Sequence, residues 1–77
     1  MNNNRRKSIR ELMESLENLK SDLETIKDEE QSAYDNLPEG IQCSERGEAM
    51  ETALENLEEA YDGLDSVLES LEAAVEG

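Results

Sequence analysis

Residues 50–75, METALENLEEAYDGLDSVLESLEAAV, contain a seven-residue repeat of apolar side chains that decides the fold of this chain. Three positions of the repeat are apolar in every copy, and their occupants are Met50, Leu57, Leu64 and Leu71; Ala53, Ala60, Val67 and Ala74; and Leu54, Tyr61, Leu68 and Val75. A face of three positions in seven is typical of a helix in a globular bundle, and it is wider than a two-stranded coiled-coil seam. The repeat therefore predicts a long helix that packs against other helices.

A second heptad pattern precedes the first and predicts another long helix. One of its positions holds Ile9, Leu16, Leu23, Glu30 and Leu37, and the other holds Leu12, Leu19, Ile26 and Ala33, with Met13 and Tyr34 widening the stripe. Glu30 is the one polar residue in this seam. It is expected to lie near the turn, where water enters, or to fix the helix register. A partner contact or a metal ligand is the alternative role.

Capping signals set the predicted ends of the first helix. Ser8 followed by Glu11 forms a Ser-x-x-Glu capping box, which leaves residues 1–7 as a frayed basic tail. Pro38 and Gly40 end the pattern. The first helix is therefore predicted over about 8–36.

The second helix is predicted to begin with Ser44 as its N-cap and to extend over about 44–76, after a connection at 37–43. Gly63 lies in its interior, where glycine costs about 1 kcal/mol relative to alanine. Since Gly63 flanks the apolar face, it either permits a close helix contact or is a tolerated weakness.

The predicted fold is all-α: residues 8–77 form one coiled-coil-like antiparallel two-helix hairpin. A two-helix hairpin cannot enclose its own core, so the wide face of the second helix predicts a homodimer that forms a four-helix bundle. The predicted core and dimer interface consists of Met50, Leu54, Leu57, Tyr61, Leu64, Val67, Leu68, Leu71 and Val75.

The charge of the chain restricts its partners. The net charge is −14, from 21 acidic and seven basic residues. Four of the basic residues lie near the N-terminus: Arg5, Arg6, Lys7 and Arg10. These four provide a small phosphate footprint, and the acidic excess repels nucleic acid and anionic membranes, so neither is an expected partner. In an antiparallel hairpin, this basic end is expected to lie beside the acidic end, Glu69–Glu76.

The residues needed for common catalytic and metal sites are missing from the sequence. There is no histidine and only one cysteine, Cys43, which excludes an intrachain disulfide, a His-based metal site and a Cys–His or Ser–His–Asp catalytic set. A single thiol favours the reducing cytoplasm. We therefore expect no enzymatic activity and no cofactor or metal.

Nine carboxylates follow one another at alternating spacings of three and four along the second helix. They are Glu48, Glu51, Glu55, Glu58, Asp62, Asp65, Glu69, Glu72 and Glu76. Like charges at these spacings destabilise a helix by roughly 0.2–0.5 kcal/mol per pair. The stripe is either a solvated helix face or a line of anions that imitates a nucleic-acid backbone.

The segments DEEQSAYDNLPE and SERGEAME, together with the heptads that follow, resemble small acidic helical proteins of Firmicutes and their phages. The resemblance covers residues 28–71 and implies a phage or mobile-element setting, in which the protein acts on a host or phage complex or belongs to a small virion or packaging component. It implies no functional residue.

Two functions follow as expectations. The first is a non-enzymatic protein-interaction module, an acidic dimeric helical bundle of phage or mobile-element origin. The alternative is a DNA mimic of the anti-CRISPR or anti-restriction type, whose acidic stripe occupies the nucleic-acid site of a basic host enzyme. Binding by mimicry is expected to weaken steeply with salt, whereas apolar docking is not.

Overall fold

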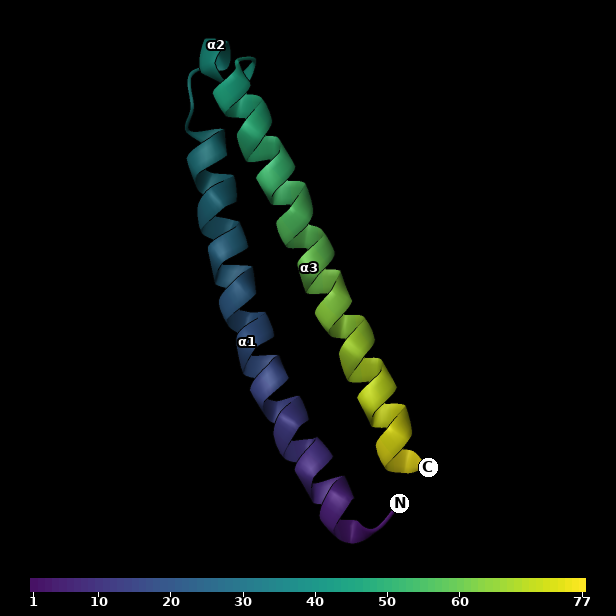
Figure 1. Cartoon of the computed structure of the whole chain (residues 1–77). Helices are drawn as coiled ribbons and strands as arrows, with labels where there is room; N and C mark the ends of the chain where they lie inside the picture. The colour runs from purple at the N-terminus through teal and green to yellow at the C-terminus, as the bar shows by residue number, and fades with distance from the viewer.

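The computed structural model describes residues 1–77 and consists of two long helices joined by a short one (Figure 1). The helices are α1 (Asn3–Asp35), α2 (Glu39–Gln42) and α3 (Glu45–Glu76). α3 returns alongside α1, so the two termini lie at the same end of the molecule. The chain extends over 58 × 15 × 12 Å. The prediction of an all-helical chain is confirmed.

The start of α1 differs from the prediction, because helix begins at Asn3 and not after Ser8. The side chain of Asn2 accepts a hydrogen bond from the Arg5 backbone N–H at 2.8 Å and thereby caps the helix. The Ser8 hydroxyl instead donates to the Asn4 carbonyl one turn back, at 3.1 Å. Residues 3–7, predicted to be a frayed tail, are therefore the first turn and a half of α1.

The basic start of α1 contacts the end of α3, as expected for an antiparallel pair. Arg6 Nε donates a hydrogen bond to the Val75 carbonyl at 3.2 Å. That carbonyl belongs to the last turn of α3, where the helix dipole places partial negative charge. The basic end is therefore bound through a backbone carbonyl, and its cations form no ion pair with the carboxylates of Glu69–Glu76.

The connection between the long helices is tight at Gly47, the only buried residue of the chain. Pro38 precedes α2, and Ser44 is the N-cap position of α3, as predicted, although its hydroxyl donates to the Ile41 carbonyl. A Cβ on Gly47 would lie 2.7 Å from Gln42 Cα and closer still to the Gln42 carbonyl group. The end of α2 therefore packs directly on the α3 backbone.

The seam of α1 uses only one of the two predicted apolar rows. Ile9, Leu16, Leu23, Glu30 and Leu37 are partly buried, but Leu12, Leu19, Ile26 and Ala33 are exposed. The second row of the seam is Met13, Lys20, Lys27 and Tyr34. The prediction is wrong here because lysine can cover apolar surface with its methylene chain while its ammonium group reaches an acid on the facing helix. Both lysine side chains are only 23% exposed.

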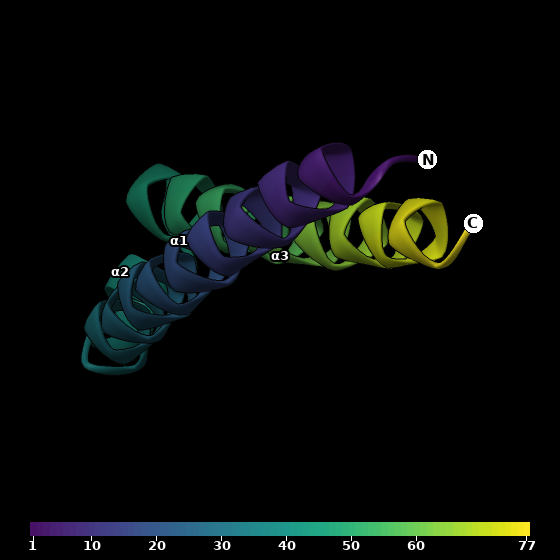
Figure 2. The same ribbon diagram turned by 90° about the horizontal axis from the view of Figure 1, so that it is seen from below.

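The seam of α3 consists of the two rows that begin at Met50 and at Leu54, all partly buried against α1. Eight of the nine predicted interface residues therefore face α1, and Val67 is the exception, at 46% exposure. Its row is otherwise made of alanines, of which Ala60 and Ala74 are exposed and Ala53 is partly buried. The end-on view shows that α1 and α3 are inclined to each other along the seam (Figure 2).

Candidate interaction surfaces

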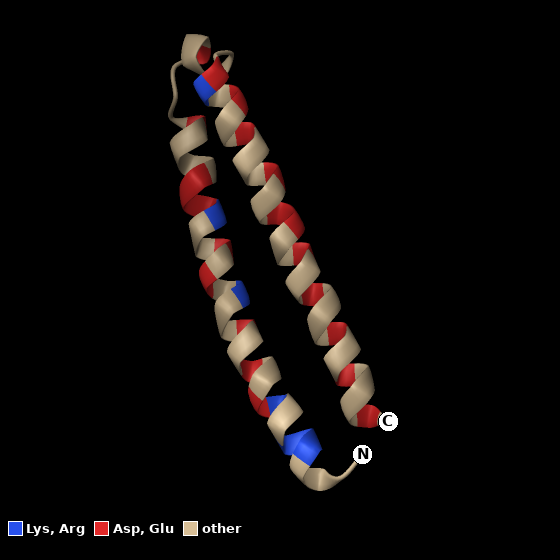
Figure 3. Ribbon diagram, viewed as in Figure 1, with Lys and Arg blue, Asp and Glu red and all other residues tan.

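The structure places the residues of interest on two faces of the hairpin. The apolar face is the name we give to two rows whose residues are all exposed except Ala53: Leu12, Leu19, Ile26 and Ala33 of α1, and Ala53, Ala60, Val67 and Ala74 of α3. We call the nine carboxylates of α3, together with Glu17 and Glu24 of α1, the acidic face. Acidic residues line both long helices, whereas most basic residues gather at the start of α1 and the others are Lys20, Lys27 and Arg46 (Figure 3).

Helix geometry puts both rows of the apolar face on the same side of the hairpin. Successive residues are turned by about 100° around a helix axis, so in α1 the row of Leu19 and the row of Lys20 flank the central row of Leu16 on opposite sides. In α3, the row of Val67 and the carboxylate of Asp65 likewise flank the row of Leu64. Because Lys20 and Asp65 meet at one edge of the seam, both apolar rows lie at the opposite edge.

The apolar face contains large side chains that the chain itself covers only in part. Leu12 is 51% exposed, Leu19 57% and Ile26 53%. They recur every seventh residue of α1, and the small row of α3 lies beside them. Apolar residues that are scattered singly over a surface are ordinary, but a continuous row of them marks an interface.

The total surface area is consistent with an open face. The accessible surface is 5576 Å², whereas a compact monomer of 8.7 kDa is expected to expose about 4,700 Å². Since only Gly47 is buried, the hairpin has an interhelical seam but no enclosed core.

On the acidic face, two lysines of α1 bind carboxylates of the predicted stripe around one aromatic ring. Lys27 Nζ lies 2.7 Å from Glu58 Oε2, and Lys20 pairs with Asp65. The two ammonium nitrogens lie 5.1 Å and 4.7 Å, respectively, from the centroid of the Tyr61 ring, within cation–π range. These pairs are the only ion pairs of the chain. Tyr61, predicted as an apolar interface residue, therefore also contacts the ammonium groups of Lys20 and Lys27.

A third cross-helix contact joins Tyr34 to the stripe. The Tyr34 hydroxyl donates a hydrogen bond to Glu51 Oε1, and this bond is the main cause of a raised Tyr34 pKa. The hydrogen bonds to Asp65 and Glu58 likewise raise the pKa of Lys20 and of Lys27. Three carboxylates of the predicted stripe, those of Glu51, Glu58 and Asp65, therefore bind side chains of α1. Their spacing in α3 alone does not predict this role.

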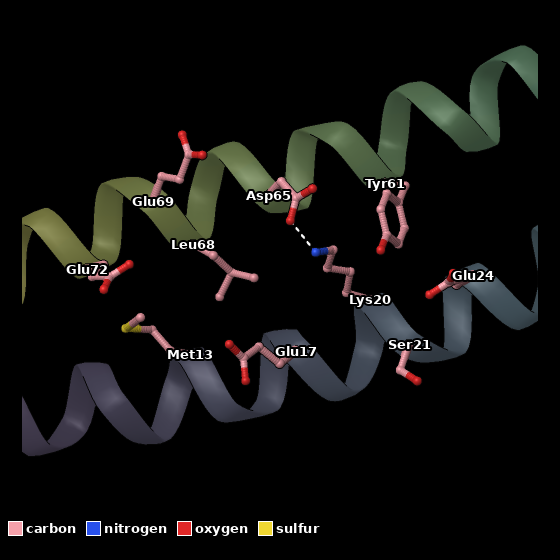
Figure 4. A pocket seen from close by; sticks show the side chains of 10 residues that line it. All are labelled: Met13, Glu17, Lys20, Ser21, Glu24, Tyr61, Asp65, Leu68, Glu69 and Glu72. Carbon is pink, nitrogen blue, oxygen red and sulfur yellow. Dashed lines mark ion pairs between the residues drawn. The ribbon is translucent and has the colours of Figure 1, made fainter.

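The remaining carboxylates of the stripe face solvent and line shallow grooves. One groove of about 350 Å³ lies around Lys20, and Glu17 and Glu24 of α1 border it opposite Glu69 and Glu72 of α3 (Figure 4). A second groove, around Lys27, includes Glu55. Glu48, Glu55, Asp62, Glu69, Glu72 and Glu76 form no ion pair. The acidic face therefore keeps most of its charge unpaired.

The other residues of interest belong to neither face, although Gly63 borders the apolar face. Cys43 is exposed in the connection, and Glu30 is partly exposed in the last turns of α1 without an ion pair. A Cβ on Gly63 would meet nothing within 4 Å. No group of three or more Cys, Asp or Glu side chains is placed to hold a metal ion.

Neither long helix contains a stretch that is apolar enough to cross a bilayer. Comparison of the chain with protein-family models, with curated proteins and with solved structures found no match. The resemblance of residues 28–71 to phage and Firmicutes proteins therefore stays a prediction.

Proposed function

We propose that this chain is a non-enzymatic, cytoplasmic protein-interaction module that self-associates through its apolar face into a four-helix bundle. The observation that supports the proposal best is the row of Leu12, Leu19 and Ile26, each more than half exposed along one side of α1. Burying apolar side chains yields about 25 cal/mol per Å², and a second pair of helices is the simplest cover for such a row. The phage or mobile-element setting belongs to the same proposal.

Sedimentation equilibrium on the native chain tests this proposal. We expect the mass of a dimer at micromolar concentration and dissociation only on strong dilution. The association constant should not fall as the salt concentration rises, because salt affects apolar burial little and screens the repulsion between two copies of net charge −14. A monomer at micromolar concentration at every salt concentration would refute self-association.

A second candidate function, binding of a basic protein by nucleic-acid mimicry, is favoured by the unpaired carboxylates of the acidic face. The free carboxylates of α3 and the groove acids Glu17 and Glu24 present anions from both helices to one side. A channel lined with Lys and Arg attracts such a surface. Since the apolar face lies at the other edge of the seam, self-association would leave this surface open.

Charge reversal separates mimicry from general acidity. The test variant changes Glu55, Asp62 and Glu69, which form no internal ion pair, to lysine. The matched control reverses Glu11, Glu39 and Glu59, which are exposed and lie outside the acidic face. Both variants change the net charge equally. Mimicry predicts that only the first variant loses a basic partner captured from the native host, and equal loss in both would contradict it.

A further inference from the structure

The contacts between α1 and α3 fix which residues of the apolar face lie at the same level along the hairpin. Lys20 lies opposite Asp65, Lys27 opposite Glu58, and Tyr34 opposite Glu51. The same register, continued to the apolar edge, sets four levels: Leu12 beside Ala74, Leu19 beside Val67, Ile26 beside Ala60, and Ala33 beside Ala53. At three of these levels the larger residue belongs to α1 and the smaller one to α3.

We propose that the apolar face is covered by a second copy of this chain whose connection lies at the same end, so that each α1 lies on the partner's α3. This inference rests on the proposed self-association and adds its geometry. The two-fold axis then lies parallel to the hairpin, between the apolar faces of the two copies. Every helix of the bundle is antiparallel to its neighbours.

Side-chain size favours this arrangement over the one with connections at opposite ends. With the connections together, Leu12 meets the partner's Ala74, Leu19 the partner's Val67, and Ile26 the partner's Ala60. Each of these layers holds two larger and two smaller residues, so the helices stay evenly spaced. With the connections at opposite ends and all four levels in contact, Leu19 meets the partner's Ile26, and Val67 meets the partner's Ala60. The two large residues hold the two α1 helices apart, whereas the small residues leave the two α3 helices close together.

The residues that border the apolar face favour the same arrangement. On α1 the border includes Asp22 and Glu29, and on α3 it includes the uncharged Asn56 and Gly63. With the connections together, Asp22 lies beside the partner's Gly63, and Glu29 lies beside the partner's Asn56, whose amide is a hydrogen-bond donor. With the connections at opposite ends, Asp22 lies beside the partner's Asp22 near the two-fold axis, and these like charges repel each other.

The dimensions of the hairpin suit a stable dimer. The covered side spans most of a molecule 58 Å long and 15 Å wide, which gives a contact on the order of 800 Å² per copy, the size of a standard protein interface. The acidic faces then point outward on opposite sides of the bundle, so the excess negative charge of each copy stays in solvent. Both basic N-termini lie at one end.

The native Cys43 allows a test without any substitution, because it is the only cysteine, is exposed, and lies in the connection. A nitroxide label on Cys43 reports the distance between the two connections by double electron–electron resonance. We expect a separation below about 30 Å, since neighbouring helices in bundles lie only 8–10 Å apart. Sedimentation equilibrium on labelled and unlabelled protein controls for an effect of the label.

The possible outcomes separate the geometry from the self-association itself. A short Cys43–Cys43 distance in a sample with the mass of a dimer supports the arrangement. A distance close to the 58 Å length of the hairpin in a sample with the mass of a dimer overturns the arrangement and leaves self-association standing. A sample that stays monomeric and shows no dipolar coupling overturns both.

Discussion

The apolar face and the acidic face of this hairpin lie on opposite edges of one seam, and they differ in what the chain itself supplies to cover them. On the acidic face, α1 contributes Lys20, Lys27 and Tyr34, which bind three carboxylates of α3. On the apolar face, α1 and α3 contribute only apolar side chains, and the large ones remain about half exposed. One edge of the seam is therefore closed within the chain, and the other is open.

This difference shows that a heptad pattern does not by itself say which of its apolar rows is buried. The row of Leu12 and the row of Met13 flank the same central row of α1. The row of Met13 contains two lysines and still packs against α3, because each ammonium group pairs with a carboxylate of α3 and lies over the Tyr61 ring. The more apolar row is left exposed, so the least polar stripe of α1 is available for a partner.

The largest expected effect comes from a charge placed on the apolar face. We expect Leu19→Asp to lower the dimer association constant by roughly 100-fold or more, because an unpaired carboxylate buried in the interface costs several kcal/mol. Thr25→Asp is the matched control: it adds the same charge to the outer side of α1, where residue 25 is exposed. Sedimentation equilibrium measures both, and equal effects of the two variants would contradict the distinction between the faces.

A smaller effect is expected at the connection, where α2 packs on the start of α3. Gly47→Ala places a Cβ against the Gln42 backbone, and overpacking of this kind typically costs about 1–3 kcal/mol. We therefore expect the free energy of unfolding, measured by urea denaturation at fixed protein concentration, to fall by that amount. Gly40→Ala is the control, since its Cβ would meet nothing within 4 Å. A Gly47→Ala variant as stable as the control would show that α2 does not pack on α3.

At the border of the apolar face, Gly63→Ala separates helix stability from association. The substitution is expected to stabilise α3 by about 1 kcal/mol, because alanine is the better helix former, and to weaken self-association, because the new methyl group faces the partner's α1. Ser66→Ala, on the outer side of α3, should leave the association constant unchanged. If Gly63→Ala strengthens the dimer as well as the helix, Gly63 is a tolerated weakness and not a close contact.

The smallest expected effect is a loss of stability at high pH through the contacts of the acidic face. Hydrogen bonds to carboxylates raise the pKa of Lys20 and of Lys27 above the ordinary 10.5, and that of Tyr34 above 10.0. The folded state therefore retains these protons more tightly than the unfolded state, so their stabilising contribution is complete below pH 10 and is lost as the pH rises through the folded pKa values.

Thermal melts between pH 9 and pH 12 at fixed protein concentration measure this loss. A variant with Lys20→Met, Lys27→Met and Tyr34→Phe should show a shallower decrease in melting temperature over that range than the native chain. Identical slopes would mean that the three contacts do not distinguish the folded state from the unfolded state.

The ends of the helices show how far local sequence signals are reliable. Ser44 is the N-cap of α3, as predicted, and Glu45 follows it in the first turn, where the helix dipole favours an anion. The prediction of Ser8 as the N-cap of α1 is wrong, because Asn2 caps the helix earlier and the residues between them are helical. A serine within a helix can return its hydroxyl to a carbonyl one turn back, so a capping box alone does not prove a helix start.

The sequence alone determined that this chain forms two long amphipathic helices separated by a connection near Pro38, because helical periodicity and chain breakers act over a few residues. It also determined the line of nine carboxylates on α3 and the acidic excess. Only the tertiary structure decided which flanking row of α1 enters the seam, which carboxylates of the stripe are bound there, and that the two leftover apolar rows share one edge. These outcomes depend on residues 17 to 45 positions apart in the chain that meet only when α3 lies antiparallel to α1.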